Sequence, residues 1–411
     1  MRTVLLGVTL VGLAAATGGC SAVLGGGRDP APVVIGADLA LTGVGSPLGT
    51  GFGNALRLRA EQVNQQRLLG DRRLELRLRD NRSDPRVAAA NLSELVADPA
   101  VTAIVSGACG PCAVGLAGQL DQHRVPLISL AAGDQVVQPV ERRRYLFQLG
   151  PRAGDDADLL AAGLDRAGAA TVALVTAEGD YPGGDYGRAG RQEMAAAAER
   201  TGFEIVAQES VVVGDPASVT AAAEAIADWR PGLDQFDAPS GPDAVVIWTP
   251  PAEADQLATD LRQAGYAGSL HLDAIAAGQL YLPTGGLSGA TLVFTDTPVA
   301  DQLIAATPAT VARQTWFRDY LAEYGTYHAH ASWAADAIGV IADAVRRADR
   351  ADPAGRHDPV DRSTLRDRIE STRRLDGLTG LIRYTADQHA GLHPESLTRL
   401  TAGDGRWHLA R

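Results

Sequence analysis

The sequence contains few aromatic residues, few cysteines and no lysine. Aromatic residues make up 5% of its 411 residues, cysteine occurs three times, and all 37 basic residues are arginine. Hydrophobic residues still make up 45% of the chain, which is enough to bury ordinary cores and predicts one or two globular domains rather than disorder. The lack of lysine gives no information about a ligand.

A basic surface is also missing. The formal net charge is −12 and the sequence pI is about 5.1. Binding to nucleic acid requires a basic face that displaces counterions from the phosphates. We therefore expect no nucleic-acid partner.

A hydrophobic run suited to crossing a membrane is missing as well. The apolar stretch at residues 4–16 is shorter than the roughly 20 residues that a membrane-spanning helix needs. It follows Arg2 and precedes small residues, which predicts a signal peptide at residues 1–19. Cys20 comes directly after two glycines and resembles the lipobox cysteine of bacterial lipoproteins. The resemblance implies an acylated Cys20, a tether at residues 20–32 and a position on the outer face of the cell membrane; the alternative is an ordinary secreted protein cut nearby.

The other two cysteines stand close together in Cys109-Gly110-Pro111-Cys112. In an oxidising compartment they can form a disulfide. The spacing also occurs in thioredoxin-like redox motifs, and two thiolates can contribute to a zinc site. We favour a structural or ligand-loop role, because no second redox element and no further nearby metal ligands accompany the pair.

Short β-branched runs alternate with longer amphipathic stretches from residue 33 onward, which predicts βαβ units with parallel sheets. The first series has expected strands at 33–37, 74–80, 101–106 and 126–129, and expected helices at 49–65, 84–97 and 113–123. The second series has expected strands at 171–176, 204–209 and 243–248, and expected helices at 154–167, 188–201, 217–229 and 252–264. Late helices at 311–324, 332–347 and 362–372, and strands at 381–384 and 397–400, complete the units.

This pattern predicts an α/β fold of two Rossmann-like lobes. Ligands of open parallel sheets bind outside the carboxyl ends of the strands. Two such sheets joined by a hinge place these ends opposite each other, so the cleft between the lobes is the expected site.

Several short motifs occur in the order and at the spacing of a known family. They are Val33-Val34-Ile35-Gly36-Ala37-Asp38, Leu41-Thr42-Gly43, Asp80-Asn81-Arg82-Ser83-Asp84-Pro85, Val125-Pro126-Leu127-Ile128-Ser129, Asp185-Tyr186-Gly187 and Trp333-Ala334-Ala335-Asp336-Ala337. Over residues 30 to 405 the chain resembles the type I periplasmic binding proteins of the branched-chain amino acid (Leu/Ile/Val-binding) class, the substrate-binding lipoproteins of ABC transporters. The resemblance implies three crossings between the lobes, near residues 149, 295 and 384. Lobe 1 then comprises 33–149 and 296–384, and lobe 2 comprises 150–295 and 385–411.

The resemblance also implies a ligand site. Loops after two first-lobe strands would hold a carboxylate through backbone N–H groups, Asp273 would hold an ammonium group, and Tyr186 and Trp248 would face the same cleft. The expected ligand-binding residues are Leu48, Cys109, Gly110, Cys112, Ala113, Ala131, Ala132, Gly133, Tyr186, Trp248 and Asp273. The loops lack the Ser and Thr hydroxyls that are usual in amino-acid binders, and a buried carboxylate without hydrogen bonds is costly. A less polar or differently shaped ligand therefore remains open.

Two clusters of potential metal ligands occur in the sequence, but structural roles explain both of them better. His328 and His330 have no acidic third ligand near them in sequence, which favours a capping or surface role. Asp155, Asp156 and Asp158 stand at a predicted helix start, where negative charge favours the positive end of the helix dipole. We expect no metal.

A cofactor and an enzymatic activity are also not expected. The glycines after the first strand do not complete a dinucleotide fingerprint, because Leu48 stands where the last glycine belongs. No nucleophile elbow or Ser/His/Asp set is evident.

We expect a monomeric, extracytoplasmic solute-binding protein that delivers an amino acid or a related small carboxylate, amide or aromatic compound to an ABC transporter permease. A sensory module is a rival, disfavoured because no signalling domain follows Arg411, and an exported enzyme on a related scaffold is a second rival.

Overall fold

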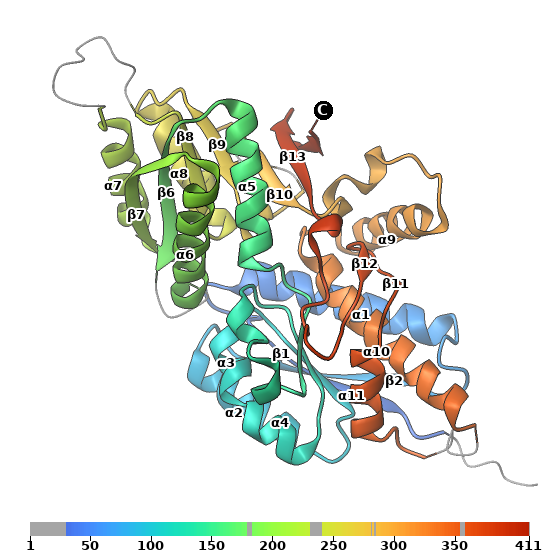
Figure 1. The fold of residues 1–411 in the computed structure, drawn as a ribbon. Coiled ribbons are helices and arrows are strands. Elements are labelled where there is room, and N and C mark those ends of the chain that lie inside the picture. The colour runs from blue at the N-terminus through green and yellow to red at the C-terminus, as the bar shows by residue number, and fades with distance from the viewer. Residues whose placement is uncertain are drawn as a thin grey trace, which may run out of the picture.

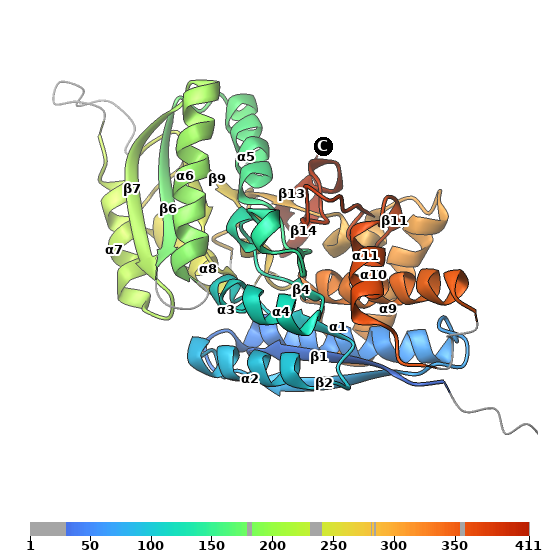
Figure 2. The same ribbon diagram turned by 60° about the horizontal axis from the view of Figure 1, so that its bottom comes forward.

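The computed structural model describes residues 30–178, 183–230, 241–280, 282, 285–353 and 358–410. The chain forms an α/β fold with two large sheets in two lobes, and helices cover both faces of each sheet (Figures 1 and 2). The predicted fold class is confirmed. The predicted signal peptide and Cys20 lie outside the described residues.

The first sheet has the strand order β2-β1-β3-β4-β5, and all its pairs are parallel. Its strands are β1 (Val33–Leu39), β2 (Leu74–Asp80), β3 (Ala103–Ser106), β4 (Leu127–Ser129) and β5 (Leu146–Gln148). Every residue of β1 is buried, as in a parallel strand covered on both faces. Its helices are α1 (Ser46–Gln65), α2 (Pro85–Ala97), α3 (Gly110–Gly115) and α4 (Ala117–His123), with α1 on one face and α2 to α4 on the other.

The second sheet has the order β14-β13-β10-β9-β8-β6-β7. Its strands are β6 (Thr171–Glu178), β7 (Glu204–Val212), β8 (Ala244–Trp248), β9 (Ser269–Leu272), β10 (Thr291–Phe294), β13 (Thr398–Gly403) and β14 (Arg406–Leu409). Helices α5 (Ala153–Ala167) and α6 (Gly183–Thr201) pack together, as do α7 (Pro216–Ala227) and α8 (Pro251–Gln263). The last two strands form a hairpin through Asp404 and Gly405, whose φ angles of 49° and 74° fit a type I′ turn.

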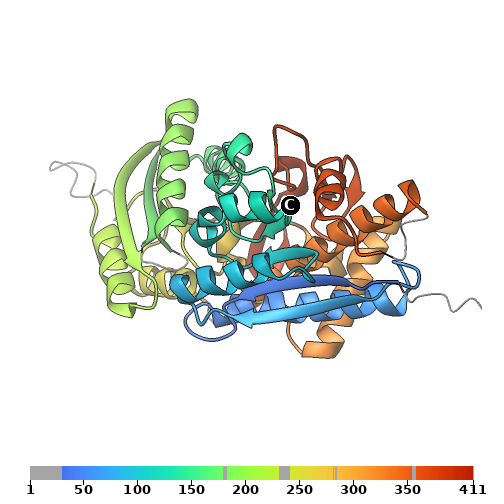
Figure 3. The same ribbon diagram turned by 90° about the horizontal axis from the view of Figure 1, so that it is seen from below.

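The chain moves between the lobes. After β10 it returns to the first lobe, where α10 (Ala331–Ala351) packs on α1, and it ends in β13 and β14 of the second sheet. Figure 3 shows the orange helices beside the blue first-lobe elements and the green second lobe at the side. The other elements are α9 (Pro308–Tyr324), α11 (Arg362–Glu370), β11 (Leu375–Asp376), β12 (Leu381–Ile382) and the 3₁₀ turns η1 (Asp134–Val136), η2 (Val140–Arg142), η3 (Ala274–Ala277), η4 (Thr297–Gln302) and η6 (Pro394–Ser396).

The structure corrects several expected elements. The helix expected at 113–123 is two helices, α3 and α4, that meet at Leu116. The strand expected at 381–384 is the short β12, which pairs with β11 in a separate ribbon. The second sheet is not wholly parallel, because β13 and β14 are antiparallel. Within the described parts of the chain, no helix is both long and apolar enough to traverse a bilayer.

Candidate functional site

Loops from the carboxyl ends of both sheets meet between the lobes and enclose a small inner cavity. Its volume is about 30 Å³, space for about one or two water molecules. The first lobe contributes the loops after β1, β3 and β4, and the second lobe contributes Tyr186 and Ile275. The lining residues are Leu48, Ala108, Gly110, Pro111, Leu130, Ala132, Gln135, Tyr186 and Ile275.

A larger cavity of about 560 Å³ adjoins the inner cavity and shares Leu48 and Ile275 with it. This volume lies in the usual range for small-molecule sites, about 300–1,000 Å³. Most of its wall is apolar. The lining residues are Val44, Gly45, Pro47, Leu48, Val213, Gly214, Pro250, Pro251, Ala252, Glu253, Asp255, Ile275, Ala276, Ala277, Gly278, Gln279, Leu282, Leu287, His328 and His330. Both lobes therefore contribute to a space large enough for a solute.

Tyr186, Trp248 and Asp273 lie together at the second-lobe side of the inner cavity. The Tyr186 hydroxyl donates a hydrogen bond of 2.6 Å to Oδ2 of Asp273, and the Tyr186 and Trp248 ring centroids are 6.0 Å apart. A Cβ at Gly190 would lie 2.6 Å from the Trp248 ring, so glycine allows α6 to lie against the indole. Of these three aromatic and acidic residues, only Tyr186 lines the cavity; Trp248 and Asp273 are buried behind it.

Asp156, on the first turn of α5, is buried near Asp273. Burial raises the pKa of Asp273 to about 7, against the hydrogen bonds from Tyr186 and Ile275. Burial, and secondly the neighbouring Asp273 carboxyl, raise the pKa of Asp156 well above its ordinary value. The sequence gives no sign of this proximity, because acids on a first helical turn already have a local explanation in the helix dipole. The two buried carboxyl groups therefore disfavour each other's charged forms.

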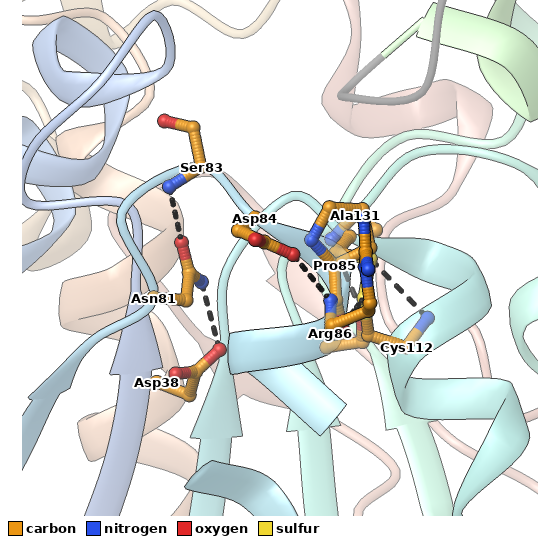
Figure 4. The surroundings of a disulfide bond; sticks show 10 residues. Asp38, Asn81, Ser83, Asp84, Pro85, Arg86, Cys112 and Ala131 are labelled. Carbon is orange, nitrogen blue, oxygen red and sulfur yellow. Dashed lines mark hydrogen bonds between the residues drawn. A yellow bond between two sulfur atoms is a disulfide. The ribbon is translucent and has the colours of Figure 1, made fainter. Parts of the chain in front are cut away.

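The loop after β3 carries a disulfide between Cys109 and Cys112. Figure 4 shows this region beside the start of α2, where the Asp84 side chain accepts a hydrogen bond from Arg86 N. Sγ of Cys112 lies 3.7 Å from the Pro85 carbonyl oxygen. The bridge thus closes the loop against α2 at the edge of the inner cavity.

Several of the backbone donors expected to hold a carboxylate already have partners, although Cys109 N and Ala132 N have none among the described residues. Gly110 N donates to the Ala108 carbonyl, Ala113 N donates to the Cys109 carbonyl, and Cys112 N contacts Sγ of Cys109. In the next loop, Ala131 N donates to Ser129 Oγ and Gly133 N donates to the Pro151 carbonyl. This geometry leaves fewer donors for a carboxylate at these loops.

The structure places the expected ligand residues in two groups. Leu48, Gly110, Ala132 and Tyr186 line the inner cavity, and Leu48 also lines the larger one. The others lie next to these residues without lining either cavity: Cys109, Cys112, Ala113, Ala131, Gly133, Trp248 and Asp273. The remaining lining residues of the inner cavity were not expected as ligand contacts: Ala108, Pro111, Leu130, Gln135 and Ile275. In the sequence, the one indication of these residues is that they lie close to expected ligand residues.

His328 and His330 are neither exposed nor side-chain caps, which corrects the role expected for them. Both are buried, and His330 precedes α10 without a side-chain capping bond. They line the larger cavity. Among the described residues, no group of three or more His, Cys, Asp or Glu side chains could hold a metal ion.

Comparisons with known proteins agree with this architecture. The sequence profile of a family described as periplasmic binding protein matches residues 32–405. No curated protein sequence matches the chain.

Solved structures of bacterial binding proteins have the same fold. An extracellular ligand-binding receptor from Rhodopseudomonas palustris HaA2 is 21% identical with a TM-score of 0.76, and the match covers 92% of this chain and 100% of that chain. The leucine binding protein LivK from Thermotoga maritima MSB8 is 20% identical, with a TM-score of 0.71 and coverages of 92% and 98%. The branched-chain amino acid transporter substrate binding protein LivJ from Streptococcus pneumoniae, solved with isoleucine, is 18% identical, with a TM-score of 0.70 and coverages of 92% and 97%.

The profile match spans most of the chain, and the two-lobed fold agrees with it. The chain belongs to the periplasmic binding protein family.

Proposed function

We propose that the protein captures a small, weakly polar solute between its lobes and delivers it to an ABC permease. The observation that supports this most is the larger cavity, which is lined by Leu48 of the first lobe and by Ile275 of the second. A solute that contacts both walls stabilises the closed arrangement, and only a ligand that binds the closed form better can shift the population toward it. The permease then recognises the closed form.

The chemical class of the solute follows from the polar groups near the cavities. The backbone donors at Gly110, Ala113 and Gly133 are occupied, which leaves fewer donors for a carboxylate at these loops. The wall of the larger cavity is mainly apolar. Among the classes expected from the sequence, amides and aromatic compounds therefore fit better than simple amino acids. Because LivK is named a leucine binding protein and LivJ was solved with isoleucine, branched-chain amino acids form the comparison arm of the test.

The test is ligand-induced thermal stabilisation of protein that lacks residues 1–20. A solute at one hundred times its dissociation constant stabilises the folded state by about 2.7 kcal/mol. We expect a rise in Tm with amides or aromatic compounds and a smaller rise with leucine or isoleucine. A panel of amino acids, amides, aromatic acids and nucleosides that leaves Tm unchanged would refute the proposal, and turnover of any panel member would indicate an enzyme.

A variant can locate the binding site. Leu48→Trp places a larger side chain at the wall shared by both cavities and is expected to abolish the ligand-induced rise in Tm. Leu409→Trp is the matched control, because Leu409 is exposed at the end of the last strand. If Leu48→Trp binds the solute as tightly as the control does, the solute does not occupy the cavities between the lobes.

We also propose that an acylated Cys20 holds the protein at the outer face of the cell membrane. The supporting features are the apolar run that ends at residue 16 and the two glycines before Cys20. Two or more acyl chains hold a protein stably at a membrane, whereas one chain alone is marginal. Cys20→Ser is expected to move the protein from the membrane fraction to the soluble fraction, and mass spectrometry of the native N-terminus should find the lipid. An unmodified N-terminus elsewhere in the chain would contradict the anchor.

A further inference from the structure

Two buried histidines form a hydrogen-bonded series at the wall of the larger cavity. His330 Nε2 lies 3.0 Å from the carbonyl oxygen of Ala274, and His330 Nδ1 lies 3.3 Å from His328 Nδ1. The two imidazole rings are 5.1 Å apart between centroids. The series therefore begins at η3 of the second lobe and ends at the His328 ring.

The Ala274 carbonyl determines where the protons lie along this series. A carbonyl oxygen only accepts, so His330 Nε2 carries the proton and Nδ1 of the neutral ring is an acceptor. His328 Nδ1 must then be the donor between the rings, and the lone pair of neutral His328 lies on Nε2. Burial lowers the pKa of His328 to about 4, and burial, together with the neighbouring His328 ring, lowers the pKa of His330 well below its ordinary value. Both rings are therefore neutral at physiological pH.

His328 stands where the lobes meet. A Cβ at Gly51, in α1 of the first lobe, would lie 2.9 Å from the Cβ of His328, so this glycine lets the histidine approach the helix. On the other side, Ala329 N donates to the carbonyl of Gly278 in the second lobe. Nδ1 of His328 is used by His330, and no described residue forms a hydrogen bond with its Nε2. His328 is one of the residues that line the larger cavity.

The other polar groups of this cavity disfavour an anion. Glu253 and Asp255 line it, and none of the described residues that line it is an arginine. Glu253 accepts a hydrogen bond of 3.0 Å from Gly214 N and is largely buried. A carboxylate or phosphate would meet like charges without a counter-ion. The cavity thus offers apolar surface and a hydrogen-bond acceptor to a ligand without negative charge.

We infer that His328 Nε2 accepts a hydrogen bond from the solute, and that the solute is a neutral, largely apolar molecule with an O–H or N–H donor at one end. This inference rests on the proposed function and specifies its ligand class. Neutral His328 selects for a donor because a ligand without one would displace water from Nε2 and leave this nitrogen without a partner, which costs binding free energy.

Two probes of nearly the same shape test the choice of ligand. 2-Naphthol carries one O–H donor, and 2-methylnaphthalene has a methyl group in its place. Calorimetry with protein that lacks residues 1–20 is expected to show about 5- to 10-fold tighter binding of 2-naphthol, as one net hydrogen bond provides. Equal affinities, or no binding of 2-naphthol, would overturn the inference.

Substitutions at His328 test the acceptor at Nε2 separately from the donor at Nδ1. His328→Asn keeps an amide near the position of Nδ1, where it can still donate to His330, but has no group at Nε2. His328→Gln reaches the position of Nε2 with an amide oxygen that can accept. We expect the preference for 2-naphthol to disappear in His328→Asn and to persist in part in His328→Gln. If His328→Asn keeps the full preference, the acceptor is another group.

Nitrogen NMR of ¹⁵N-histidine-labelled protein tests the proton positions without a ligand. Nε2 of His328 is expected to have the shift of an unprotonated ring nitrogen at pH 7, and to move toward the protonated range when 2-naphthol is added. A protonated Nε2 in the free protein would overturn the inference even if other solutes stabilise the protein. Failure of the whole ligand panel would instead overturn the proposed function, whatever the tautomer.

Discussion

The hydroxyl of Tyr186 donates a hydrogen bond of 2.6 Å to Oδ2 of Asp273, and both side chains are buried. The two residues are 87 positions apart in the sequence. Oδ2 also accepts from Ile275 N, whereas Oδ1 of Asp273 has no hydrogen-bond partner among the described residues. The bond therefore joins the start of α6 to the loop after β9 and leaves one carboxyl oxygen available.

Removal of this hydroxyl is expected to destabilise the protein. Tyr186→Phe leaves Asp273 without its side-chain donor, which should lower the free energy of unfolding by about 1–3 kcal/mol. Urea denaturation measures the change. Tyr145→Phe is the control, because the Tyr145 hydroxyl lies 3.3 Å from Ser363 Oγ at a partly exposed position. A loss in Tyr186→Phe no larger than in the control would contradict the role of the bond.

The free energy of unfolding is expected to depend on pH through Asp273. Burial raises the pKa of Asp273 to about 7, so between about pH 4 and 7 the folded state binds a proton that the unfolded state has released. The stabilisation of the folded state by this proton is fully present below pH 4. It declines by about 1.4 kcal/mol per pH unit as the pH rises toward 7. Asp273→Asn lacks it, so the variant should become more stable relative to the wild type as the pH rises.

The comparison with Asp273→Asn is needed because His328 acts in the opposite direction. Its pKa is lowered to about 4, so its contribution is present above about pH 6.5 and declines as the pH falls toward 4. The difference between wild type and Asp273→Asn cancels this effect. A difference that stays constant from pH 4 to 8 in urea denaturation would show that Asp273 has an ordinary pKa.

The disulfide is expected to contribute only modestly to stability. Cys109 and Cys112 are separated by three positions, and for so small a loop the chain-entropy contribution is about 2 kcal/mol. The double variant Cys109→Ala/Cys112→Ala, in protein that lacks residues 1–20, should lose about this amount in urea denaturation. Dithiothreitol should destabilise the wild type similarly and leave the double variant unchanged. A response of the double variant to the reductant would mean that the measured loss has another cause.

Glycine at the start of α6 is expected to be irreplaceable. In Gly187→Ala, the added Cβ would lie 1.9 Å from the carbonyl oxygen of Ala177 in β6. Such overpacking is expected to lower the free energy of unfolding by about 1–3 kcal/mol. Because Gly187 follows Tyr186, the displaced helix should also alter the near-ultraviolet circular dichroism. Gly118→Ala in α4 is the control, since no atom lies within 4 Å of its Cβ, and it should stabilise the protein by about 0.5–1 kcal/mol. Equal stabilities of the two variants would contradict the close approach of α6 to β6.

The sequence alone determined the architecture. The strand expected at 74–80 has the same bounds as β2, and the run that begins at Val33 forms the buried β1. Apolar β-branched runs and amphipathic stretches are local patterns, and the local period specifies the element type. The motifs from Val33 to Trp333 likewise indicated the family that the profile match shows. These features required no knowledge of which residues meet in space.

The tertiary structure determined the burial, the pKa values and the proton positions of the groups between the lobes. Asp156 and Asp273 are far apart in sequence, and each has a local role at the start of a helical segment. His328 and His330 became a tautomer-defined series only because the Ala274 carbonyl lies within 3.0 Å of the second ring. Burial, pKa and proton position depend on neighbours from other elements, so no local pattern could specify them. For the same reason, only the packed lobes reveal where a cavity remains.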